Sequence, residues 1–170
     1  MSIRKSTLNR PSLAVLALIM AIVIVSVGTY DRWWNLRILV VEPFYLGHLL
    51  GIVGASWIAV FTPIYVYLKR KSPQHSKTLI NIHIIGNLVA FLIFSMHFWQ
   101  QIGRPAEFAP ELGTGLSLYI ILSTMVVTGL MMRFHIGRRF LKTWRTTHIG
   151  LTASFYIVLI IHVLHNIGVL

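Results

Sequence analysis

The chain has 170 residues, of which 56% are hydrophobic and only 11% are charged. Because a typical soluble domain has about 25% charged residues, this composition argues against an ordinary soluble fold. The chain has no cysteine, which excludes disulfides, thiolate-held iron–sulfur clusters and haem attached through a C-x-x-C-H motif. It also has no G-x-G-x-x-G loop before a helix and no Walker loop, so we expect no nicotinamide- or flavin-binding domain in it.

The apolar residues are gathered into long blocks, each close to the roughly 20 residues that a helix needs to cross a bilayer. We predict five membrane-spanning helices. They cover approximately residues 12–29, 45–68, 79–99, 113–132 and 148–169. No linker rich in Ser, Gly or Pro divides the chain, so we expect residues 1–170 to form a single all-α transmembrane domain.

The basic residues alternate with the predicted helices. They are Arg4, Lys5 and Arg10 before the first helix, Lys69, Arg70, Lys71 and Lys77 in the second connection, and Arg133, Arg138, Arg139, Lys142 and Arg145 in the fourth. This pattern follows the positive-inside rule and predicts a cytoplasmic N-terminus and an outer C-terminus. A nucleic-acid surface would not skip every second connection. We therefore expect a multi-pass protein of the plasma or inner membrane that contacts lipid and no nucleic acid.

Four histidines lie in two of the apolar blocks with the same spacing. His83 and His97 are 14 residues apart in the third predicted helix, and His148, which is expected to open the fifth, is 14 residues before His162. Fourteen helical residues make nearly four turns, so the members of a pair point to nearly the same side, about 21 Å apart. The two helices run in the same direction, which brings the partners to matching depths.

Imidazole is a good axial ligand for haem iron, so this spacing predicts two haems stacked across the membrane. His83 and His148 would hold the inner haem, and His97 and His162 the outer haem. Gly86 and Gly150 would leave bare helix surface for the porphyrin, although helix packing is an equal alternative. Arg145 is expected near the propionates of the inner haem, because it lies nearly one helical turn before the haem ligand His148. Arg104 is a weaker candidate for the same role at the propionates of the outer haem.

Other interpretations of the histidines remain open. An intramembrane histidine is often a hydrogen-bond partner between helices. A site for a metal ion alone would need three or four ligands clustered together. His165 or His48 could replace an outer ligand, whereas His75 and His135 are expected in solvated cytoplasmic connections.

Two segments resemble the ferric reductase-like transmembrane domain family, which includes ferric reductases, NADPH oxidases and the haem-binding membrane subunit of the bacterial methionine sulfoxide reductase system. They are INIHIIGNLVAFLIFSMHF at 80–98 and GRRFLKTWRTTHIGLTASFYIVLIIHVLH at 137–165, which contains the W-R-x-x-H motif of Trp144 to His148. The resemblance covers roughly residues 45–165 and implies that the four histidines are ligands of b-type haems. Relatives usually have a sixth span, and the reductases and oxidases add a flavin and nicotinamide domain that is lacking here.

These observations together predict an all-α integral membrane protein whose last four helices bundle around two b-type haems. Its expected function is electron transfer from a cytoplasmic-side donor protein or a quinol to an acceptor protein on the outer side. One alternative is a quinol-oxidising haem anchor subunit of a larger respiratory complex. Another is a haem-free membrane scaffold packed through its glycines.

Overall fold

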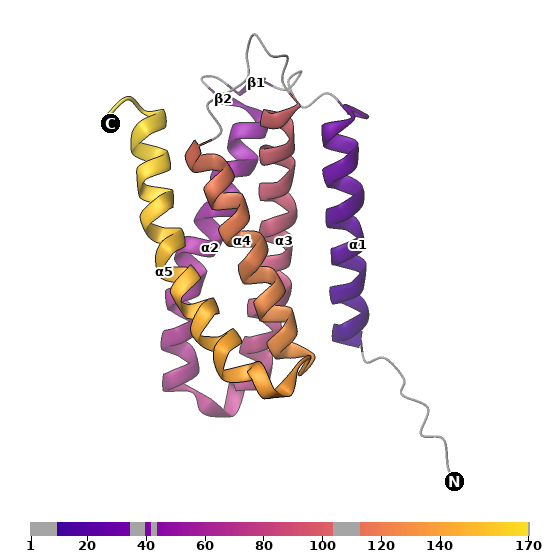
Figure 1. Cartoon of the computed structure of the whole chain (residues 1–170), viewed down its shortest axis with the longest axis vertical. Coiled ribbons are helices and arrows are strands. Elements are labelled where there is room, and N and C mark those ends of the chain that lie inside the picture. The colour runs from indigo at the N-terminus through magenta and orange to yellow at the C-terminus, as the bar shows by residue number, and fades with distance from the viewer. Residues whose placement is uncertain (1–9, 35–39, 42–43, 104–112, 170) are drawn as a thin grey trace. The chain divides into compact units, whose positions relative to one another are not determined.

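The structure is a computed structural model that describes residues 10–34, 40–41, 44–103 and 113–169 (Figure 1). Within these residues the long elements are five helices, α1 (Arg10–Tyr30), α2 (Leu46–Lys71), α3 (Ser76–Ile102), α4 (Gly113–Arg133) and α5 (Leu141–Asn166). Each of them is long and apolar enough to cross a membrane. The chain is therefore a multi-pass membrane protein with helical spans, as its sequence predicts.

Short elements lie in the connections between the helices. Strand β1 (Val40–Val41) pairs antiparallel with β2 (Phe44–Tyr45), a pairing that the sequence did not predict. Two 3-10 turns, η1 (Pro73–His75) and η3 (Arg138–Phe140), precede α3 and α5. Both turns therefore lie in the strongly basic connections.

The first turns of α5 correct one prediction. The sequence placed the start of the fifth span at residue 148, whereas α5 begins at Leu141. The added residues include exposed polar side chains such as Lys142 and Arg145, which an apolar block cannot reveal because it marks only the hydrocarbon-spanning part. His148 consequently lies about two turns inside its helix instead of opening it.

Three helices end in the same hydrogen-bond motif. A backbone N–H donates to the carbonyl five residues earlier, from Trp33 to Gly28 (2.8 Å), Ile136 to Met131 (3.0 Å) and Val169 to Leu164 (2.9 Å). The residue before each donor is left-handed, namely Arg32, His135 and Gly168, with φ of 58°, 55° and 74°. This is the Schellman closure of a helix C-terminus. It ends α5 at Asn166, before the predicted boundary, and makes His135 the residue at which the chain turns away from α4.

The described chain divides into two compact units, Met1–Met96 and His97–Leu170, and the boundary falls inside α3. In the first unit α2 and α3 pack tightly through glycine. A Cβ atom added at Gly54 would lie 2.9 Å from the carbonyl oxygen of Ala90, and one added at Gly86 would lie 2.7 Å from the Trp57 indole. Gly54, one of the buried glycines of α2, therefore serves helix packing.

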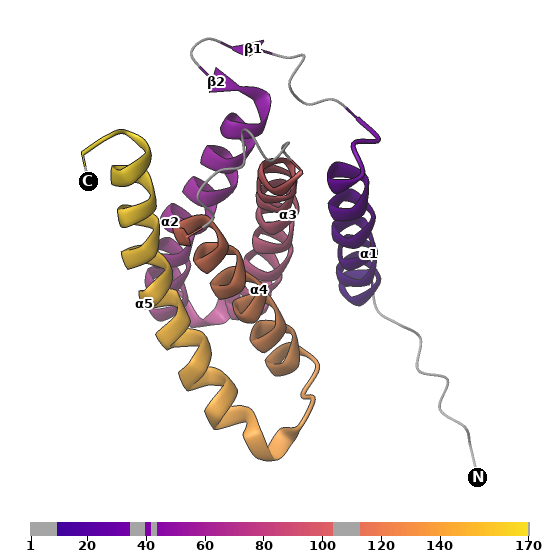
Figure 2. The same ribbon diagram turned by 45° about the horizontal axis from the view of Figure 1, so that its top comes forward.

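In the second unit α4 lies along α5 as an antiparallel hairpin (Figures 1 and 2). The C-terminal end of α3 joins α4 through aromatic contacts. Phe98 stacks on Tyr119 with ring centroids 3.9 Å apart, and the Trp99 indole N–H donates to the Tyr119 hydroxyl at 3.1 Å. The Trp99 side chain thus has a hydrogen-bond partner within the protein.

Seven hydroxyl groups of α4 and α5 are satisfied within their own helices. Those that donate to the carbonyl four residues earlier are Ser117, Ser123, Thr124, Thr128, Thr146, Thr152 and Ser154. Such bonds supply a partner that lipid cannot supply.

The two glycines of the first unit predict different tolerance to substitution. Gly54→Ala should lower the free energy of unfolding by about 1–3 kcal/mol, because the new methyl group meets backbone that cannot move away. Gly86→Ala should have a smaller effect, because its neighbour is the exposed Trp57 side chain, which can turn aside, and not backbone. Unfolding of both variants in mixed micelles measures this difference. An equal or reversed order would contradict the packing described at Gly54.

Candidate functional site

His148 faces α4 through one ring nitrogen. Its Nδ1 lies 3.1 Å from the hydroxyl oxygen of Thr128 and 3.1 Å from the carbonyl oxygen of Met125. A carbonyl oxygen only accepts, so the proton belongs on Nδ1. The Thr128 hydroxyl donates its own proton to the carbonyl of Thr124 at 2.8 Å, which leaves its lone pairs to accept from the ring. His148 is thus held as the tautomer with a lone pair on Nε2.

His162 also contacts a threonine of α4, near the other end of α5, but among the described residues this contact is made without a carbonyl at Nδ1. Its Nδ1 lies 2.9 Å from the hydroxyl oxygen of Thr114. The Asn166 amide nitrogen lies farther away, 3.4 Å from Nδ1 and 3.5 Å from Nε2, and donates its better bond to the His162 carbonyl at 2.7 Å. Thr114 is therefore the main partner of this ring.

A glycine follows each of the two threonines and lies against the same imidazole. A Cβ atom added at Gly129 would lie 3.4 Å from Cε1 of His148, and one added at Gly115 would lie 3.6 Å from Cε1 of His162. The Thr-Gly pairs of α4 are 14 residues apart, as are the histidines of α5. Because α4 and α5 are antiparallel, Thr128 and Gly129 meet His148, and Thr114 and Gly115 meet His162. Equal spacing was the sequence signal for these partners, and our sequence analysis missed it.

His83 lies on α3 in the first unit and stacks on Tyr65 of α2, with ring centroids 4.2 Å apart and planes 15° from parallel. The Asn87 amide nitrogen lies 3.2 Å from its Nδ1. The other amide atom, Asn87 Oδ1, is buried and has no hydrogen-bond partner in the described structure. Turning the amide over would pair this oxygen with a protonated Nδ1 and give His83 the tautomer of His148.

The remaining predicted ligand, His97, is half-buried on α3 and belongs to the second unit. Of the weaker candidates, His48 is half-buried on α2 and His165 is exposed on α5. His75 is exposed in η1, as expected for a solvated connection. Among the residues that the structure describes, no three His, Asp or Glu side chains gather in a group that could hold a metal ion.

The predicted auxiliary residues have different surroundings. Gly86 meets the Trp57 indole, which is the packing role that the sequence left open, whereas a Cβ atom added at Gly150 would meet nothing within 4 Å. Arg145 is exposed. Beside it, the indole Nε1 of Trp144 is buried without a hydrogen-bond partner among the described residues, one turn before His148. Arg104 lies outside the described residues.

No family model, curated protein or solved structure matches this chain. The resemblance to the ferric reductase-like family thus stays a prediction from the quoted motifs.

The residues of α4 and α5 fit a haem-ligating role. Metal-bound histidines almost always donate the second ring nitrogen to a carbonyl, carboxylate or water, which orients the ring and raises its basicity. His148 meets this requirement through Met125, and His162 has a hydroxyl at the equivalent place. The unpartnered Trp144 N–H is a suitable donor to an anionic propionate.

Proposed function

We propose that the protein is a membrane cytochrome with two b-type haems that carries electrons from one face of the bilayer to the other. The observation that supports this most is the matched pair of contacts between α4 and α5. Two histidines four turns apart both engage threonine through Nδ1. Each ring can then present Nε2 as a ligand, at two depths about 21 Å apart.

Under this proposal His83 and His148 hold the inner haem, and His97 and His162 hold the outer one. Bound haem supplies reversible one-electron chemistry at its iron. The chain's own residues orient the ligands and exclude water from the span between the faces. Trp144 donates to an inner propionate, with Arg145 as a second donor, and Gly150 leaves its side of α5 free of a side chain.

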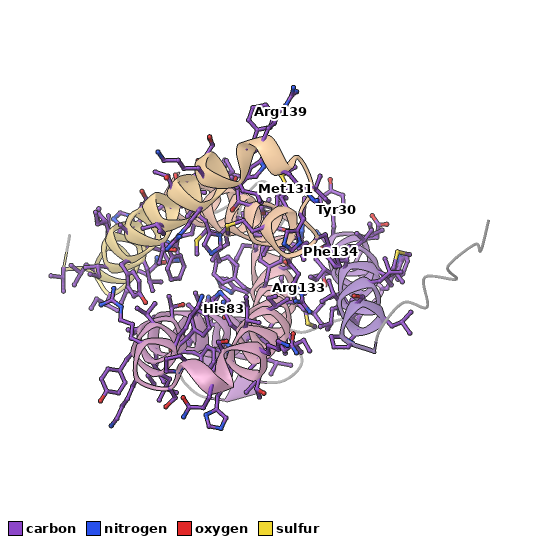
Figure 3. The ribbon with its side chains drawn as sticks, turned by 90° about the horizontal axis from the view of Figure 1, so that it is seen from below. Tyr30, His83, Met131, Arg133, Phe134 and Arg139 are labelled. Carbon is purple, nitrogen blue, oxygen red and sulfur yellow. The ribbon has the colours of Figure 1, made fainter. Side chains whose placement is uncertain are left out.

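Electron donor and acceptor belong to partners under this proposal. Lys69 and Lys77 around η1 and Arg138 and Lys142 around η3 are exposed, whereas Arg133 at the end of α4 is half-buried. Figure 3 shows Arg139 pointing away from the turn between α4 and α5. Such residues attract anionic lipid headgroups and fix the orientation of the chain. A flavoprotein or a quinol would deliver electrons at this cytoplasmic face, and an acceptor protein would take them outside.

The haem content of the purified protein tests the proposal directly. Reduction with dithionite should give the sharp α-band of a bis-histidine low-spin haem, and pyridine haemochrome analysis should give about two haems per chain, from the four ligands. Protein without haem would support the scaffold alternative, in which the same histidines only join helices. A ratio near one would exclude the two-site arrangement.

A further inference from the structure

We infer that Thr114 and Thr128 are positioning residues: Thr114 fixes the tautomer of His162, Thr128 assists the Met125 carbonyl in fixing that of His148, and both set how strongly these rings donate electrons through Nε2. The inference rests on the proposed function for its redox consequence, but not for the tautomer itself. Neither threonine touches a cofactor in this proposal. Each acts only through the ring nitrogen that faces α4.

The two histidines are not fixed equally firmly. His148 Nδ1 has two acceptors at 3.1 Å, the Thr128 hydroxyl and the Met125 carbonyl. His162 Nδ1 has one close hydroxyl, Thr114 at 2.9 Å, and an amide nitrogen farther off. The Met125 carbonyl remains beside His148 when Thr128 is replaced, whereas among the described residues only the more distant Asn166 amide, 3.4 Å from Nδ1, remains beside His162 when Thr114 is replaced. Loss of Thr114 should therefore have the larger effect.

An ordinary structural role for these hydroxyls predicts something different. Thr124 is on the same helix and makes the same bond to its own backbone, from its hydroxyl to the Ile120 carbonyl at 2.8 Å. The hydrogen bonds that the described residues make to the two histidine rings come from other residues. If the threonines served only helix stability, Thr124→Val and Thr128→Val would be equivalent. Thr124→Val is the control for Thr128→Val, because both changes keep the branched shape of the side chain and replace the hydroxyl with a methyl group, although Thr128 is buried and Thr124 half-buried.

In the haem-loaded protein the readout is the midpoint potential of each haem. A hydrogen bond from Nδ1–H makes imidazole a stronger donor, which favours ferric iron, so its loss should raise the potential. Thr114→Val should raise the ferrous-to-ferric ratio of one haem by up to about tenfold at fixed potential, or about 59 mV for one electron. Thr128→Val should raise that of the other haem by less, and Thr124→Val should change neither. Thr114→Ser and Thr128→Ser, which keep the hydroxyl, should have the midpoint potentials of the wild-type protein.

In haem-free protein the readout is the tautomer of each ring, from nitrogen NMR of histidine-labelled samples assigned with His148→Ala and His162→Ala. Both rings should carry the proton on Nδ1, and Thr114→Val should move it to Nε2 in His162, while Thr128→Val leaves His148 largely unchanged. A wild-type His162 ring protonated on Nε2 would overturn the inference whether or not haem binds. With haem bound, unchanged potentials in Thr114→Val would also overturn it, without affecting the two-haem proposal.

Discussion

Replacement of either His83 or His148 with alanine is expected to remove the same haem and leave the other in place. Haem content should fall from about two per chain to about one, because a b-type haem is held mainly by its two axial ligands. His97→Ala and His162→Ala should remove the second haem. Redox titration of each variant identifies the missing haem by its midpoint potential. A variant that lacks both His83 and His148 should have the same haem content as either single variant.

His75→Ala is the matched control, because this exposed histidine of η1 should leave both haems unaffected. Loss of one common haem in His97→Ala and His148→Ala would show that the ligand pairs are crossed and that equal depth is not the rule. An outer haem retained in His162→Ala would identify His165, three residues later, as the ligand.

Electron transfer through vesicles should require both haems. With reductant trapped inside and an impermeant acceptor outside, the wild-type protein should reduce the acceptor, and any variant lacking one haem should reduce it at a small fraction of that rate. The reason is distance. Two sites about 21 Å apart span most of a core of about 30 Å, whereas one site is far from one of the two faces.

The vesicle experiment needs the haem content of every sample, since loss of transfer means nothing if both haems are absent. His75→Ala again serves as the control that keeps its rate. Undiminished transfer in a variant shown to contain one haem would reject the two-haem path. A rate that depends on added quinol instead of trapped soluble reductant would favour the quinol-oxidising anchor subunit.

The positions of the five helices could be predicted because block length and apolar composition are properties of each segment alone. The start of α5 could not, because Leu141 to Thr147 is helical without being apolar. The β1 and β2 pair was also missed, since strands of two residues are too short to show an alternating pattern.

The candidate site was predictable in part for a related reason. Histidine is uncommon in a span, so His148 and His162 stand out by residue type. Thr114 and Thr128 are ordinary residues of a membrane helix and gain meaning only from the antiparallel pairing of α4 with α5. The role of Gly86 depended on a neighbour in space, Trp57, which no spacing within one helix reveals.

The hydroxyl bonds within α4 and α5 have a consequence for biosynthesis. A helix whose serines and threonines already have carbonyl partners can enter the bilayer without waiting for its neighbours. The rings of His148 and His162 differ, because their Nδ1 partners lie on α4, the helix made just before. As α5 leaves the ribosome and joins α4, the burial of these rings favours association of the two. The hairpin of α4 and α5, with both histidine contacts, would thus be assembled during insertion.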